Sequence, residues 1–314
     1  MTPLLALGAA LLLSTCGPAL LRALGRAGAA PRTLLVLWVL ATAAWLVTWC
    51  ALLLMLVTRL LGPGVKGIIA ACVTLLQAAH RNGAEFAVSA LLAAGAAVLF
   101  RLGWVALRQR RETARWRRRH RRDLDACATP RTLHRRRVWF VDTGAPGVYC
   151  VPGGGRGIVV TRGAVEALSA REMRAVLAHE LAHLRGRHHL LVAWTRLLDD
   201  AFPGVPLLRA AAREVPVLVE WAADDRAVRA VGRGPLVHAL GAMAGTRAES
   251  GAAALAISGS CAVQRVRRLV APSSAPARGS ALAVLAGAAL VLPPLLTAAA
   301  TLAGVVLSHC ACAA

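Results

Sequence analysis

The stretch SAREMRAVLAHELAHLRG, from Ser169 to Gly186, carries a helix start signal, an apolar helical pattern and a helix stop signal. Ser169 followed three residues later by Glu172 is the pattern of a capping box, in which each side chain bonds the other residue's backbone N–H. Glycine directly after the last turn is a common helix terminator. These residues predict a helix from Ala170 to about Arg185, ending at Gly186.

His179 and His183 lie within this helix in the pattern H-E-x-x-H. A spacing of four residues puts both imidazoles on one helical face, from which they can reach a single zinc ion. Glu180 follows His179 directly and is the candidate base that holds the metal's water. The alternative is a histidine–glutamate pair on a solvated helix face. The apolar flanks favour the zinc site, because buried polar side chains are costly unless they are used.

A third candidate ligand follows in the sequence Glu220-Trp-Ala-Ala-Asp224. Two histidines, a glutamate and a position left for water describe a catalytic zinc site rather than a closed structural one. Asp224 lies one turn after Glu220 and is expected to hydrogen-bond the far nitrogen of a ligand histidine. The alternative for Glu220 is a surface glutamate. His188 and His189 are either residues at the helix boundary or contacts to the substrate or oxyanion.

The composition indicates a membrane protein. Of 314 residues, 57% are hydrophobic, and the mean hydropathy is +0.59. These values exceed those of soluble domains and exclude a disordered chain. Spanning helices of ~20 apolar residues are expected at 3–24, 34–57, 86–107 and 281–307. Residues 67–79 form a shorter run, predicted to be interfacial or re-entrant, and whether residues 202–219 enter the membrane is left open.

Charge and cysteine patterns refine this prediction. The chain has 37 Lys and Arg against 15 Asp and Glu, and residues 101–137 alone contain 14 Arg. Basic segments favour the cytoplasmic side and anionic lipid headgroups, so residues 108–280 are expected in the cytoplasm and both termini outside. Nucleic-acid binding is not expected, because Trp116 stands alone among the arginines. The eight cysteines are expected to be mostly reduced, and the close pair Cys310 and Cys312 has no assigned role.

Short β-prone runs precede the helix. Strands are predicted at 138–142, 147–152 and 158–161, with a glycine-rich turn at 153–157. The last strand is expected to offer an edge on which an extended substrate could pair. The expected fold is an α-helical membrane protein with about four spanning helices and an inserted α+β metallopeptidase domain. The predicted parts are a membrane region at 1–107, an Arg-rich juxtamembrane segment at 108–137, a peptidase domain at 138–280, a fourth span at 281–307 and a tail at 308–314.

Several of these motifs resemble known integral-membrane zinc metallopeptidases of the gluzincin type. The runs Val151-Pro-Gly-Gly-Gly, Ile158-Val-Val-Thr-Arg-Gly163, Ala175-Val-Leu-Ala-His-Glu-Leu-Ala-His183 and Glu220-x-x-Ala-Asp224 are similar to those of HtpX-type and CaaX-prenyl-protease-type peptidases. The expected layout of spans resembles the BlaR/MecR-type peptidases. Those β-lactam sensor-transducers carry an extracellular sensor domain after the last span, whereas only residues 308–314 follow here.

The resemblance implies a multi-pass zinc endopeptidase of the cell membrane, with one zinc ion and a cytoplasmic active site that cleaves protein or peptide substrates. A winged-helix transcriptional repressor is a candidate substrate. The alternatives are HtpX-like quality control of membrane proteins and a non-catalytic zinc-binding receptor or scaffold. The base Glu180 disfavours the scaffold. Cleavage inside the bilayer is disfavoured by arginines that bracket the motif helix, at Arg171, Arg174, Arg185 and Arg187.

Overall fold

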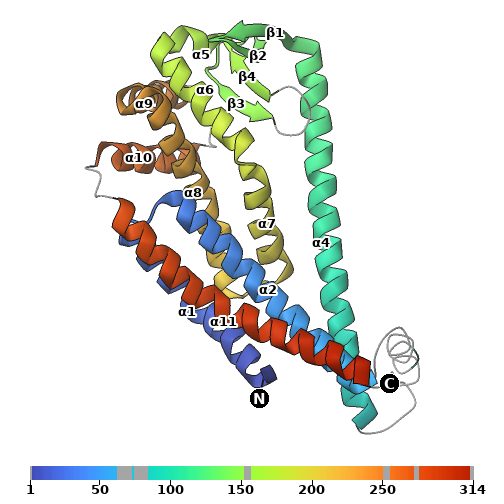
Figure 1. The fold of residues 1–314 in the computed structure, drawn as a ribbon. Helices are drawn as coiled ribbons and strands as arrows, with labels where there is room; N and C mark the ends of the chain where they lie inside the picture. The colour runs from blue at the N-terminus through green and yellow to red at the C-terminus, as the bar shows by residue number, and fades with distance from the viewer. Residues whose placement is uncertain are drawn as a thin grey trace. The chain divides into compact units, whose positions relative to one another are not determined.

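The computed structural model describes residues 2–61, 73, 84–151, 157–249, 255–271 and 276–311 (Figure 1). The chain forms two compact units. Unit 1 comprises Met1–Arg110, Thr195–Ala212 and Ala277–Ala314, and unit 2 comprises Arg111–Trp194 and Arg213–Pro276. The expected interfacial run at 67–79 lies outside the described residues, apart from Val73.

Unit 1 contains the apolar helices. In the described part of the chain, three helical stretches are long and apolar enough to cross a membrane: Pro3–Arg26 in α1 (Thr2–Arg26), Pro31–Leu56 in α2 (Pro31–Leu61) and Ala281–Gly304 in α11 (Pro276–Ala311). Three of the expected spans thus correspond to helices that could cross a membrane. The other, at 86–107, falls in α4 (Ala84–Cys127), where the side chains of residues 86–92 are not described.

Two polar side chains of α2 have hydrogen-bond partners in other helices of unit 1. The Trp45 indole N–H donates to the Ser14 hydroxyl at 2.6 Å, and the Thr48 hydroxyl donates to the Pro294 carbonyl at 3.1 Å. A lipid environment requires such pairing, because no water is present to satisfy polar groups there. These bonds link α1 and α11 to α2.

The ends of two further helices also belong to unit 1. Helix α7 (His188–Ala201) and helix α8 (Pro206–Val231) meet in a short connection within Thr195–Ala212. The ring of Phe202 lies 5.3 Å from that of Trp45 in α2, and the Arg101 side chain of α4 donates to the Ala201 carbonyl at 2.7 Å. Part of the 202–219 stretch therefore packs against helix α2.

Unit 2 contains a four-stranded sheet of β1 (Ala128–Leu133), β2 (Arg136–Val141), β3 (Val148–Val151) and β4 (Gly157–Thr161). The order is β1-β2-β4-β3, with β2 and β4 parallel and the other neighbours antiparallel. The three predicted strands are confirmed. Because β4 pairs on both sides, the expectation that residues 158–161 form an edge is wrong, and β3 lies at that edge.

Strand β1 is not predicted by the sequence. It is mostly exposed and contains Pro130, which an edge strand tolerates. Its loop to β2 consists of His134 and Arg135, both with positive φ, at 47° and 61°. Two such residues are typical of a type I′ hairpin turn, in which glycine or asparagine is the usual signal.

Helix α6 (Ala170–Arg185) confirms the predicted helix and its capping box. The Ser169 backbone N–H donates to Glu172 at 2.8 Å, and the Ser169 hydroxyl accepts from the Glu172 N–H. The apolar face of α6 packs on the sheet, in a core that includes Val138, Val148, Ile158, Val160, Met173, Val176 and Leu177. Each such buried side chain stabilises the fold by roughly 1.5–3 kcal/mol. Unit 2 is completed by α5 (Arg162–Ala167), α9 (Arg233–Glu249) and α10 (Leu255–Val270).

Candidate metal centre

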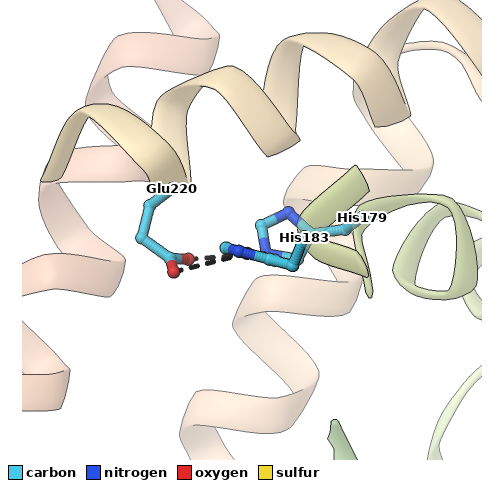
Figure 2. A group of neighbouring side chains, drawn as sticks. All are labelled: His179, His183 and Glu220. Carbon is cyan, nitrogen blue, oxygen red and sulfur yellow. Dashed lines mark hydrogen bonds and ion pairs between the residues drawn. The ribbon is translucent and has the colours of Figure 1, made fainter. Parts of the chain in front are cut away.

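Two helices of unit 2 bring His179, His183 and Glu220 together (Figure 2). The Nε2 atoms of the two histidines on α6 lie 3.0 Å apart. The carboxylate of Glu220 on α8 lies 3.4 Å from each of them, through Oε2 to His179 and Oε1 to His183. One possible ligand atom from each of these three residues thus lies within 4.8 Å of the others, although Glu220 is distant from the histidines in the sequence.

The spacing of these donors fits a small metal ion. Tetrahedral ligands at ~2.0–2.1 Å from zinc lie about 3.4 Å from one another. The two histidine nitrogens lie 3.0 Å apart, and each lies 3.4 Å from a different oxygen of the Glu220 carboxylate. Nitrogen and carboxylate oxygen are also the donors that zinc accepts in catalytic sites. The cluster could therefore hold one metal ion.

Asp224 and Arg265 support the cluster from outside. The Asp224 Oδ1 atom lies 3.0 Å from Nδ1 of His179, and its side chain is fully buried. Arg265 of α10 donates to both carboxylate oxygens of Asp224, at 2.6 and 2.9 Å, and also lies 3.3 Å from Glu220. The buried carboxylate is thus paired with a guanidinium, as buried charges require.

The electrostatics of the metal-free cluster follow from this network. Burial alone would lower the pKa of His179, but hydrogen bonds to Asp224 and Glu220 raise it to about 9. Burial lowers the pKa of His183 to about 4. Burial would raise the pKa of Glu220, yet the hydrogen bond from His179 and the surrounding positive charges lower it to about 2. The metal-free site therefore holds a carboxylate and a proton centred on His179.

Glu180 lies in a different environment from Glu220. Burial raises its pKa, and the charge of His179 and a hydrogen bond from Cys150 only partly oppose this shift. Cys150 belongs to the edge strand β3, and burial together with the Glu180 carboxylate raises the pKa of its thiol to about 12. A raised pKa makes a carboxylate a stronger base than an ordinary glutamate, which suits a general base.

The two histidines after the helix have different surroundings. His188 is buried, and its Nδ1 atom lies 3.0 Å from Nδ1 of His183. For His189, the described residues show no contact with the cluster. Burial and the charges of Arg117 and Arg187 lower the pKa of His189.

Sequence patterns miss two residues of this site. Arg265 is one of several arginines in α10, and no spacing links it to the motif on α6. Cys150 stands in a short apolar strand, where cysteine is usually a small hydrophobic residue. Both join the site only through tertiary packing.

The comparisons with known proteins give one positive result. Neither the curated proteins nor the solved structures yield a match to this chain. Residues 111–266 match the model of Peptidase family M48, whose members are metal-dependent peptidases. The matched segment contains His179, His183 and Glu220. The chain has three helices that could cross a membrane, and it carries an M48 metallopeptidase domain.

Proposed function

We propose that this protein is a membrane-anchored zinc endopeptidase, in which His179, His183 and Glu220 bind one zinc ion and Glu180 is the general base. The observation that carries the proposal is the group of His179, His183 and Glu220, with one possible ligand atom from each within 4.8 Å of the others, next to the partly buried Glu180, whose pKa is raised. The family match supports a peptidase that acts on protein substrates.

The roles of the protein groups follow from their positions. A bound zinc ion would supply a Lewis acid that lowers the pKa of a water molecule towards ~7 and stabilises negative charge on the scissile carbonyl oxygen. Glu180 accepts a proton from the attacking water and delivers it to the leaving amine. Asp224 keeps Nδ1 of His179 hydrogen-bonded, which leaves Nε2 of that histidine for the metal.

Strand β3 is the proposed docking edge for substrate. Among the described strands it pairs only with β4, and it carries Cys150 beside Glu180. An extended peptide that adds to this edge would form main-chain hydrogen bonds along β3 and lie next to the general base.

Orientation and domain limits belong to the proposal as well. The 14 arginines between residues 101 and 137 support a cytoplasmic peptidase domain by the positive-inside rule. We propose a span at 86–107 in addition to the three described ones, a juxtamembrane segment at 108–137 that contacts anionic lipids, and a peptidase domain at 138–280. Residues 281–307 then form the last span.

Two classes of substrate are proposed: a single regulatory protein, such as a winged-helix repressor, and damaged membrane proteins. Quantitative proteomics of cells lacking the peptidase separates them. Accumulation of one cleavage target supports regulated proteolysis, whereas accumulation of many membrane proteins supports quality control.

The central experiment measures zinc per chain and proteolysis of an unfolded protein for the full chain in mild detergent. We expect one zinc per chain in the wild type, loss of zinc in His183→Ala, and retention of zinc with loss of activity in Glu180→Gln. The matched controls are His238→Ala and Glu166→Gln, which change exposed side chains of unit 2 and should keep both properties. Zinc-loaded wild type without activity would support a scaffold, and wild type without zinc would refute the site.

A further inference from the structure

The histidine His183 has a partner of unusual chemistry on the side away from the metal cluster. Its Nε2 atom faces His179 and Glu220, so its Nδ1 atom points outward, to within 3.0 Å of Nδ1 of His188. The two rings are nearly perpendicular, at 85°, with centroids 4.8 Å apart. A histidine that binds metal through Nε2 carries its proton on Nδ1 and needs an acceptor there. An unprotonated Nδ1 atom of His188 is such an acceptor.

The backbone between α6 and α7 is built to bring this ring back onto α6. Gly186 ends α6, Arg187 adopts a left-handed conformation with φ of 48°, and His188 begins α7. A Cβ atom at position 186 would collide with the His188 ring, lying 2.5 Å from its Cδ2 atom, and would be 3.0 Å from the Ala182 carbonyl oxygen. The ring can occupy its place only because residue 186 is glycine.

The two candidate metal histidines therefore have different outer partners. Nδ1 of His179 faces the buried carboxylate of Asp224 at 3.0 Å, which is the common arrangement. Nδ1 of His183 faces an imidazole, itself buried with 8% exposure. Because His188 packs against Gly186 and His183, its position suits support of a ligand better than contact with substrate.

We propose that His188 is a positioning residue, which accepts a hydrogen bond from Nδ1 of His183 and so holds that ring with Nε2 free for the metal. This inference rests on the proposed function, because it presumes that His183 is a ligand. By this proposal, the turn at 186–188, which lies outside the H-E-x-x-H motif, contributes to metal affinity.

The test compares side chains that differ only in the acceptor atom. His188→Phe keeps a buried ring but removes the acceptor, whereas His188→Asn places an amide oxygen close to the position of Nδ1. Neighbouring His189→Phe and His189→Asn are the matched controls. Gly186→Ala keeps the imidazole but displaces it, and so tests the same contact if His188→Phe folds poorly.

The readouts are the Zn²⁺ affinity of the full chain in detergent, by competition with a chromophoric chelator, and the visible spectrum of the Co²⁺-loaded protein. Loss of a partner of this kind typically lowers metal affinity 10–100-fold. We expect that loss, with altered Co²⁺ bands, in His188→Phe and Gly186→Ala. His188→Asn and both His189 variants should stay within about threefold of wild type, well below the 10–100-fold loss.

Affinity in His188→Phe or in Gly186→Ala equal to that of the His189 controls would overturn the inference while leaving the proposed function intact. An equal loss in His188→Asn and His188→Phe, with the fold retained by circular dichroism, would also overturn it, because the acceptor atom would then be irrelevant. A wild-type chain that binds no Zn²⁺, or a His183→Ala chain that binds it normally, would overturn the proposed function itself and this inference with it.

Discussion

Replacing Arg265 by Gln tests how strongly unit 2 depends on the ion pair between α8 and α10. The Asp224 side chain is fully buried and receives two hydrogen bonds from Arg265, at 2.6 and 2.9 Å. Removing one partner of a buried pair costs about 3–5 kcal/mol, because a charge is left without compensation. His179 still faces Asp224 at 3.0 Å, so we expect the lower end of this range, about 3 kcal/mol, or roughly a hundredfold in an equilibrium constant.

Hydrogen exchange of the metal-free full chain in detergent, followed by mass spectrometry of peptides from α8, measures this loss locally. Exchange should be about a hundredfold faster in Arg265→Gln. The control Arg267→Gln changes an exposed arginine on the same helix and should match the wild type. The double variant with Asp224→Asn removes both charges of the Arg265–Asp224 pair, so we expect a favourable coupling of about 1–3 kcal/mol.

Two results would refute this reasoning. Wild-type exchange rates in Arg265→Gln would mean that Asp224 does not depend on the guanidinium. Strictly additive effects of the two single replacements would mean that the loss in each variant comes from packing and not from the charge left behind.

Three further predictions concern the scaffold around the site. Gly163→Ala should destabilise unit 2 by about 3 kcal/mol, because its Cβ would collide with the Gly144 carbonyl and break the 2.9 Å bond from Gly163 to Thr143; unchanged thermal unfolding would contradict this. Ser169→Ala should cost about 1 kcal/mol through loss of the helix cap, measured by the same unfolding assay. Hydrogen bonds from Ser169 lower the pKa of Glu172, so its contribution to stability is present above the ordinary glutamate pKa and is lost as pH falls through the lowered value. Wild type should therefore lose stability relative to Glu172→Gln in acid, and a constant difference across pH would contradict the prediction.

Local patterns in the sequence predict the elements that depend on neighbouring residues. The capping box and the terminal Gly186 predict the limits of α6, and the structure has the same limits. Long apolar runs predict α1, α2 and the core of α11 for a comparable reason, because a spanning helix satisfies its own backbone bonds. The i, i+4 spacing alone is enough to put His179 and His183 on one face.

Strand pairing shows where local patterns fail. The apolar run 158–161 predicts a strand but not its neighbours, and β4 lies in the sheet interior with β3 at the edge. Strand β1 has no apolar alternation, and it forms because β2 offers it a complete ladder of partners. Pairing of this kind depends on the whole sheet and leaves no mark in a short stretch of sequence.

By itself, the sequence of this protein determined helix α6, the apolar helices α1, α2 and α11, and the placement of His179 and His183 on one helix face. Only the tertiary structure decided that Arg265 bonds Asp224, 41 residues away, and that Cys150 lies against Glu180. The tertiary structure also decided that Nδ1 of His188 lies next to Nδ1 of His183. The physical reason is range: helix formation and capping are settled within one or two turns of the chain, whereas the partners of a buried charge depend on which helix faces pack together.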